Sequence, residues 1–261
     1  MHEKQISHYE QEIYFSLKEG GIYDIDFIRQ LVKMKRETLL VLLSRMQKKG
    51  WITRLKKGMY VVNSPNSTQL NDPFLAALRI FGGYLGFSSA LYIYNLTDEQ
   101  ISTIYVCTLN KSGKRIMGDI TINAIRLGRR ATGMTFLNGY FVSSKPKTLY
   151  DCFYKPELSG WYSNILAAVN RLKLSDSDWD MFLFYVRKFG NSGFSRKVGF
   201  LLELLKNKVG TDIPGSVIQK LNTSGSVVKL GLGRNGKFIK KWNVVNYIDE
   251  GDLLGKILWK R

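Results

Sequence analysis

Basic side chains are concentrated in one short stretch of the sequence. Between Arg29 and Lys57 there are ten Lys or Arg residues and one acid, Glu37, so these 29 residues carry a formal charge of +9 out of +18 for the chain. The ten are Arg29, Lys33, Lys35, Arg36, Arg45, Lys48, Lys49, Arg54, Lys56 and Lys57. A dense group of such side chains is typical of a surface that contacts phosphates. The first chemistry that the sequence predicts is binding of a polyanion.

The elements that must position these side chains can be read from the same stretch. A short helix opened by Asp24 or Asp26 is followed by a tight turn and by a second helix over 36–49. Two short strands, 51–55 and 59–62, alternate apolar and polar residues around a Lys-Lys-Gly tip, which is a hairpin pattern. This order of helix, turn, helix and two-stranded ribbon predicts a winged helix-turn-helix.

The second helix is expected to be buried on one side. Leu39, Leu42, Leu43 and Met46 follow the i, i+3, i+4, i+7 spacing of a buried stripe, and the residues away from it are mostly basic or polar. Such a helix fits the major groove of DNA, and the basic hairpin tip would meet phosphates beside it. The alternative is a small helical domain with a solvated basic face. DNA binding is favoured because element order and charge placement agree independently.

The chain is long and apolar enough for more than one domain. It has 261 residues, of which 44% are hydrophobic, so building a core presents no difficulty. We expect an α+β protein with a winged helix-turn-helix domain at 1–64, a polar linker at 65–71, a larger mixed domain at 72–210 and a basic C-terminal extension at 211–261 packed on that domain.

The larger domain is expected to combine an antiparallel sheet with a helical layer. Asp72 and Pro73 have the pattern of an N-cap and a first helical residue. Strands are predicted at 102–109, 119–127 and 134–144, because these segments are rich in β-branched and aromatic residues. Three amphipathic stretches follow, with starts predicted at Ser175 or Asp176 for one and at Ser195 for another. They are read as the helical layer.

The extension contains a glycine pattern with two interpretations. Gly231-x-Gly233-x-x-Gly236 has the spacing of a dinucleotide-binding motif, which requires a helix directly after the last glycine. The pair Asn235-Gly236 is instead typical of a type I′ turn. We therefore predict a hairpin between the segments VVKLGLG and KFIKKW, and no bound cofactor.

The catalytic inventory is small. The two histidines, His2 and His8, both lie near the N-terminus, so the remaining residues offer no His-based zinc site or general base. Cys107 and Cys152 are expected to be buried free thiols and not a disulfide. We therefore expect neither enzymatic activity nor a metal.

A metal-dependent nuclease is the enzymatic alternative. Its site requires a carboxylate, and then an acidic residue or Gln, one intervening position and Lys, to hold magnesium and activate water. The triplet found is Gln47-Lys48-Lys49, on the predicted basic helix, where nothing suggests metal binding. No stretch approaches the roughly 20 apolar residues of a membrane span, and the N-terminal sequence lacks the apolar core of a secretory signal. We expect no membrane partner and a cytoplasmic location.

Several segments together resemble the AbiEi family of type IV antitoxins, which are described as acting in phage defence beside a nucleotidyltransferase-fold toxin. The resemblance covers roughly 25–205, and the run around SKPKTLYDC is its most specific part. The matching pieces are RLKKGMYVV (54–62), SSALYIYNLT (88–97), VSSKPKTLYDCFYKPELSG (142–160) and RKVGFLLELL (196–205).

The resemblance implies a repressor and antitoxin in one chain. Its first domain would bind inverted repeats in its own promoter, with a homodimer on DNA as one arrangement, and its second domain would oppose the toxin without a stable complex. The implied DNA contacts are Lys35, Arg36, Thr38 and Arg45 of the helix and Arg54, Lys56 and Lys57 of the wing. Asp151 and Arg196 match the family pattern in the second domain, where Asp151 is read as a structural, partly buried carboxylate more readily than a functional one. A winged-helix regulator with a ligand-sensing or dimerisation domain remains the other non-enzymatic reading.

Overall fold

The computed structural model describes residues 7–17, 21–63 and 72–258 and shows a mixed α+β protein with several sheets. It divides into two compact units. The first consists of Met1–Gly82 with Arg115–Thr121, and the second of Gly83–Lys114 with Ile122–Arg261.

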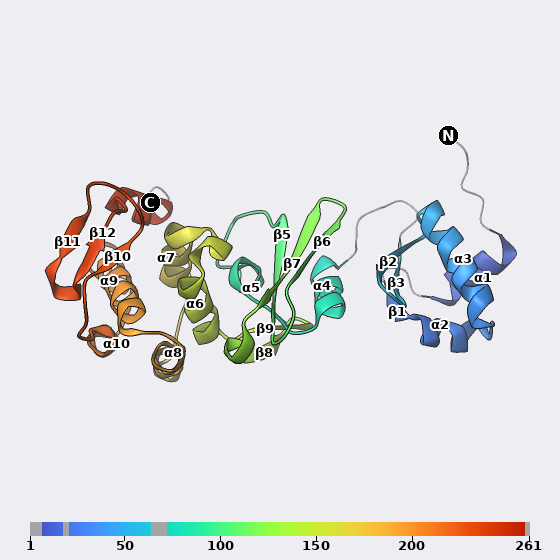
Figure 1. Cartoon of the computed structure of the whole chain (residues 1–261), viewed down its shortest axis with the longest axis horizontal. Coiled ribbons are helices and arrows are strands. Elements are labelled where there is room, and N and C mark those ends of the chain that lie inside the picture. The colour runs from blue at the N-terminus through green and yellow to red at the C-terminus, as the bar shows by residue number, and fades with distance from the viewer. Residues whose placement is uncertain (1–6, 18–20, 64–71, 259–261) are drawn as a thin grey trace. The chain divides into compact units, whose positions relative to one another are not determined.

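The first unit begins with three helices around a common core (Figure 1). The side chain of Asp24 accepts a hydrogen bond from the amide of Phe27 and caps the second helix. Asp24 was one of the two residues predicted to begin this helix. The third helix has the predicted bounds and ends at Gly50, whose φ of 80° is accessible to glycine without strain. The helices are α1 (His8–Ser16), α2 (Ile25–Val32) and α3 (Arg36–Lys49).

A three-stranded antiparallel sheet completes this unit, in the order β1-β3-β2. The strands are β1 (Ile22–Asp24), β2 (Ile52–Lys56) and β3 (Met59–Val62). The predicted hairpin of β2 and β3 is confirmed, whereas β1 was not predicted because three residues carry too little alternation. The stripe of Leu39, Leu42, Leu43 and Met46 is buried against Ile13 and Ile28.

The predicted linker, 65–71, lies outside the described residues. The helix after it, α4 (Pro73–Phe81), has the predicted Asp72 cap and Pro73 start. We placed the start of the second domain at Asp72, whereas α4 belongs to the first compact unit and the second begins at Gly83. The physical reason is packing, because Ala76 of α4 is buried with Leu55 and Val61.

The larger sheet has six strands in the order β6-β7-β5-β4-β9-β8. Its strands are β4 (Tyr84–Leu85), β5 (Thr103–Thr108), β6 (Gly113–Met117), β7 (Ile120–Arg126), β8 (Met134–Leu137) and β9 (Tyr140–Ser143). The predicted antiparallel pairing is found between β4 and β5 and between β8 and β9, but β4 pairs with β9 in parallel. The segment 134–144 forms two strands instead of one, because Asn138 and Gly139 both have positive φ and reverse the chain.

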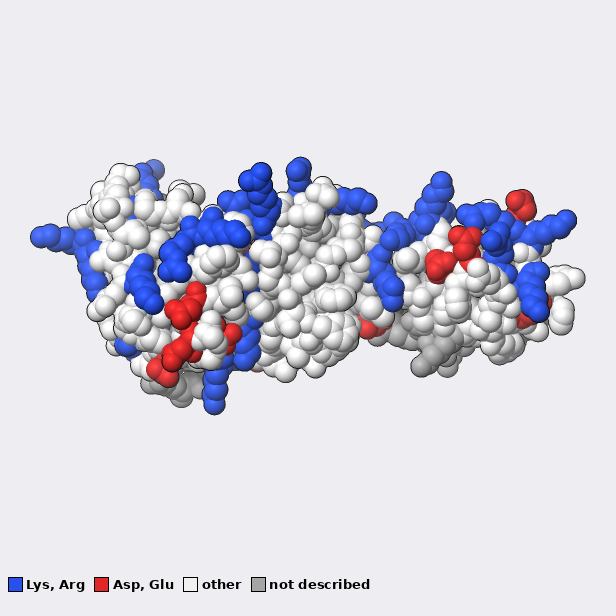
Figure 2. Space-filling view, turned by 90° about the horizontal axis from the view of Figure 1, so that it is seen from below, with Lys and Arg blue, Asp and Glu red and all other residues white. Residues whose placement is uncertain are grey.

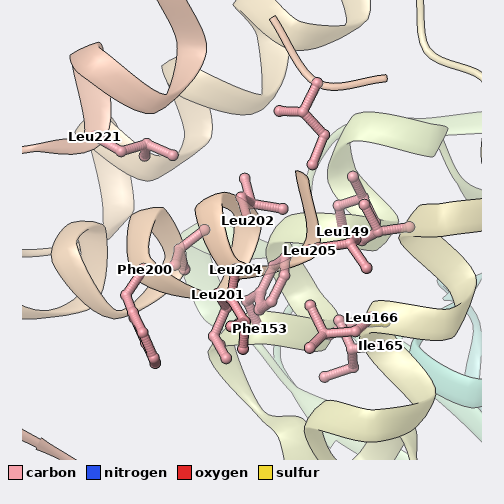
Figure 3. Close-up of a cluster of buried hydrophobic side chains, with 14 of the residues drawn as sticks. Leu149, Phe153, Ile165, Leu166, Phe200, Leu201, Leu202, Leu204, Leu205 and Leu221 are labelled. Carbon is pink, nitrogen blue, oxygen red and sulfur yellow. The ribbon is translucent and has the colours of Figure 1, made fainter. Parts of the chain in front are cut away.

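A helical layer packs beside this sheet (Figure 1). Its core joins apolar side chains of several helices, including Leu149, Leu166 and Leu205 (Figure 3). Ser175, one of the two predicted starts, caps its helix and forms a capping box with Asp178. The cap predicted at Ser195 is wrong: Asn191 caps that helix, and the Ser195 hydroxyl donates to the carbonyl of Leu221. The helices are α5 (Phe87–Ile93), α6 (Lys145–Tyr154), α7 (Trp161–Arg171), α8 (Asp176–Phe189), α9 (Ser192–Val209), α10 (Gly215–Leu221) and α11 (Glu250–Leu258).

The C-terminal segment forms a small sheet in the order β10-β12-β11. The strands are β10 (Val228–Leu230), β11 (Lys237–Ile239) and β12 (Val244–Asn246). The predicted hairpin is wrong, because both earlier strands pair with β12, one in parallel and one antiparallel. The 3-10 helix Lys240–Trp242 reverses the chain and buries Trp242 completely.

The glycine pattern of this segment has a packing explanation. A Cβ atom on Gly236 would lie 2.7 Å from the Tyr247 ring, and one on Gly231 would lie 2.6 Å from the Ile248 side chain. The strand β11 follows directly after Gly236, where a dinucleotide motif requires a helix. The glycines leave room for Tyr247 and Ile248.

Candidate nucleic-acid interface

The outer face of α3 carries the first group of predicted contact residues. Lys35, Arg36, Thr38 and Arg45 are all exposed, while the opposite face is buried in the core. At 100° of rotation per residue, Thr38 and Arg45 lie on one flank of the buried stripe and Arg36 lies on the other. The helix therefore presents one broad polar and cationic surface.

Arg36 is held by an acidic neighbour. Its guanidinium Nη1 lies 2.8 Å from Oδ1 of Asp26 on α2, and both side chains are about half exposed. A solvent-exposed pair of this kind contributes at most about 1 kcal/mol. A phosphate or a base edge can therefore compete for Arg36 with little loss of folding free energy.

The turn between β2 and β3 carries the second group. Arg54, Lys56 and Lys57 are exposed, and Gly58, with a φ of 76°, closes the turn. The ammonium Nζ of Lys56 donates to the carbonyl of Arg79 at 2.7 Å. Within the described ranges Lys57 makes no ion pair, so its charge is available to an anion.

The N-terminus of α3 differs from that of its neighbours. The Lys35 side chain makes no capping hydrogen bond, whereas Ser7 caps α1 and Asp24 caps α2. The first amide groups of a helix carry a partial positive charge and bind anions. The basic residues Lys35 and Arg36 therefore stand beside helix amides that the cap residue leaves without a side-chain acceptor.

Two buried contacts hold this surface in place. Glu10 of α1 is 1% exposed and accepts a bond of 2.6 Å from the ammonium of Lys49, at the end of α3. Burial acts to raise the pKa of Glu10, but the bonds from Lys49 and Ser7 lower it below its ordinary value. The amide of Asn63 donates to the carbonyl of Gly50 at 2.9 Å, which ties β3 to the end of α3.

The structure adds residues that our predicted contact set did not contain. Val41 and Lys48 are exposed on the side of α3 opposite the buried stripe, and Leu40 is 42% exposed. Their spacing was visible in the sequence. Apolar groups at such positions contact thymine methyls in the major groove of DNA. Figure 2 shows Lys and Arg side chains gathered along one side of the N-terminal part, with fewer acidic ones among them.

Asp151 lies far from solvent. It is 0% exposed and forms an ion pair with Lys147, four residues earlier on α6, which is equally buried. Tyr84, Tyr150 and Tyr185 surround the ammonium, with ring centroids 5.3 to 5.9 Å from Nζ. Burial raises the pKa of Asp151 to about 6, against the opposing charge and hydrogen bond of Lys147. In this conformation the carboxyl cannot touch a macromolecular partner.

Arg196 is buried as well, at 1% exposure. Its guanidinium donates to the carbonyls of Ser192 on α9 and of Gly225, Ser226 and Trp242 in the C-terminal segment. A charged donor satisfied by four carbonyls binds the C-terminal sheet to α9. The structure therefore does not bring Asp151 and Arg196 into an exposed site with the basic residues of α3.

Cys107 and Cys152 are buried free thiols, as predicted. Burial, and next the charge of Asp151, raise the pKa of the Cys107 thiol well above its ordinary value. In the part of the chain that the structure describes, no group of three or more His, Cys, Asp or Glu residues is placed to hold a metal ion.

No helix among these residues combines the length and apolarity needed to cross a membrane. In comparisons with known proteins, no family model matches the sequence and no curated protein matches it.

Proposed function

We propose that the first unit is a winged helix-turn-helix in which α3 is the recognition helix and the β2–β3 hairpin is the wing. The protein would bind duplex DNA in the cytoplasm and repress transcription from its own promoter. The observation that carries this proposal is the surface of α3 and the wing: the seven predicted contact residues are all exposed, while Leu39, Leu42, Leu43 and Met46 behind them are buried. This combination suits a helix that reads one groove while the core holds its other side.

The proposed action of the second unit rests on the resemblance to AbiEi-type antitoxins. There the chain would oppose a nucleotidyltransferase-fold toxin without forming a stable complex with it. The buried positions of Asp151 and Arg196 support a structural role for these matching residues, in building the unit. We therefore assign no catalytic residue.

Titration of DNA with the full-length chain tests the repressor proposal. The expected result is tighter binding to the DNA upstream of its own gene than to random duplex, with a logarithmic salt slope of about −0.9 for each phosphate neutralised. Lys173→Ala, which removes an exposed charge in the second unit, is the matched control and should leave binding unchanged. Equal affinity for both duplexes at every salt concentration contradicts the proposal, and cleavage of plasmid with magnesium would favour the nuclease.

Co-expression tests the antitoxin proposal separately. If an adjacent reading frame encodes a nucleotidyltransferase-like protein, its expression alone should stop growth, and expression of this chain should restore it. The Lys56→Ala/Lys57→Ala variant should still restore growth, because the wing lies in the first unit. If this chain binds DNA normally but does not restore growth, the repressor proposal stands and the antitoxin proposal is contradicted.

A further inference from the structure

The two edges of the six-stranded sheet differ in charge. The edge strands are β6 and β8. An edge strand offers unpaired amide and carbonyl groups to other chains, and proteins usually protect such edges with Lys, proline or bulges. The edge β6 contains Lys114 and Arg115, whereas the fourteen residues 131–144, which include β8, contain no charged residue and no proline. The β8 edge lacks the usual protection.

The unprotected edge is also apolar. Met134, Phe136 and Phe141 are 56%, 65% and 48% exposed. Phe136 lies opposite Phe141 in the register of β8 and β9, with ring centroids 5.3 Å apart. Met134 is two residues from Phe136 on the same strand, so the three side chains share one face of the hairpin. Contiguous exposed apolar side chains of this kind mark interaction surfaces.

Charge restricts the partner that this edge can take. The chain carries a net charge of +18, so most of its surface repels a second copy and attracts anions. The uncharged residues 131–144 offer no electrostatic attraction to an anionic partner. Figure 2, viewed from the side where β8 and β9 lie in Figure 1, shows a white area without charged side chains there. Two copies can approach each other at this edge without bringing like charges of residues 131–144 together.

We propose that β8 is a homodimer interface, in which the strand pairs antiparallel with β8 of a second copy across a two-fold axis. A strand paired with itself about such an axis is self-complementary, so the same patch serves both subunits. The pairing joins the two six-stranded sheets and covers Met134 and Phe136 with their counterparts. The inference stands independently of DNA binding, although a two-fold dimer would have the symmetry of an inverted repeat.

The molar mass of the full-length chain in solution tests this proposal, by sedimentation over a range of concentrations. The wild-type chain is expected to dimerise. Phe136→Lys places a charge on the edge and should raise the dimer dissociation constant by about tenfold or more, equivalent to about 1.4 kcal/mol. Ile116→Lys on β6 is the matched control, since Ile116 is 68% exposed, and should leave the dimer intact. Circular dichroism checks that both variants fold.

Cross-linking provides a second measurement, which does not require a charge to be introduced at Phe136. Thr135 is exposed on β8, and both natural cysteines are buried. Thr135→Cys should form an intersubunit disulfide on mild oxidation, while Ile116→Cys should not. A chain that stays monomeric at about 100 μM, well above the dissociation constants of specific dimers, overturns the proposal. So does a dimer that Phe136→Lys leaves unchanged, and in either case the edge serves a different partner or none.

Discussion

The ion pair of Lys147 and Asp151 is fully buried in the second unit. Both side chains are 0% exposed, and Oδ2 of Asp151 makes no hydrogen bond among the described residues. Taking two charges out of water costs several kcal/mol for each ion, so such a pair contributes less to stability than its short contact suggests. Each of the two charges nevertheless needs the other as its counter-ion in the protein interior.

Removing one member should cost more than removing both. Lys147→Met leaves a buried carboxylate without a counter-ion and is expected to lower the free energy of unfolding by about 3–5 kcal/mol. The double variant Lys147→Met/Asp151→Leu fills the same space with apolar groups and should lie close to the wild type or above it. Urea unfolding of the three chains checks this. A double variant as unstable as the single one contradicts it.

The same carboxyl predicts a pH dependence. The pKa of Asp151 is raised from its ordinary value of 3.8 to about 6. Between these pH values the carboxyl of Asp151 keeps a proton in the folded chain and releases it in the unfolded chain. Its contribution to the free energy of unfolding is therefore present at low pH and lost as the pH rises through the folded pKa. The stability of the wild type relative to the double variant should therefore fall between about pH 4 and pH 7. A difference that stays level or rises in urea unfolding would show that the carboxyl remains ionised.

The recognition helix and the wing divide the work of binding in the proposed complex. Side chains beside the groove contact phosphates and act on all sequences alike, whereas those at the start of the helix reach base edges. Lys57 has no ion pair within the described ranges, and Arg36 is only weakly held by Asp26. Substitutions at these two places should therefore have different effects.

Lys57→Ala is expected to weaken binding to every duplex by a similar factor and to reduce the salt slope by about 1. Arg36→Ala should instead reduce the preference for the specific site, by about 1–3 kcal/mol of discrimination. Fluorescence anisotropy with specific and random duplexes at several salt concentrations measures both. Lys173→Ala again serves as the control. The same pattern of loss for both variants would show that α3 does not read bases.

Across the whole chain, the two compact units make different demands on their polar residues. The first buries the carboxylate of Glu10 and pairs it with Lys49, whereas the second buries Arg196 and uses it to bind the C-terminal sheet to α9. Hydrogen bonds from a charged donor are worth about 1.5–3 kcal/mol each. The C-terminal segment therefore depends on one side chain from a helix far earlier in the sequence.

Arg196→Met should release this segment while leaving DNA binding intact. The carbonyls of Gly225 and Ser226 would lose their donor, and the loop around them should open. Limited proteolysis is expected to cut between residues 222 and 243 several times faster than in the wild type. Lys197→Met, at the next and partly buried position, is the control. Equal cleavage rates would mean that apolar packing around Trp242 holds the segment without Arg196.

Much of this architecture could be predicted from local sequence. The bounds of α3, its buried stripe, the Asp24, Asp72 and Ser175 caps and the hairpin of β2 and β3 all follow from residue types within one or two helical turns of each other. The concentration of charge between Arg29 and Lys57 and the exposure of the seven candidate residues could also be predicted. These features depend on neighbours in sequence, because helix periodicity and capping act over three or four residues.

Features that depend on partners far away in the sequence could not be predicted from it. The two-residue strand β4, its parallel pairing with β9, and the pairing of β10 with β12 join segments separated by many residues. The four carbonyl partners of Arg196 and the room that Gly231 and Gly236 leave for their neighbours likewise exist only once the chain has folded. Strand partners and buried polar contacts are selected by packing in three dimensions, and a pattern of a few residues carries no information about what will lie against it.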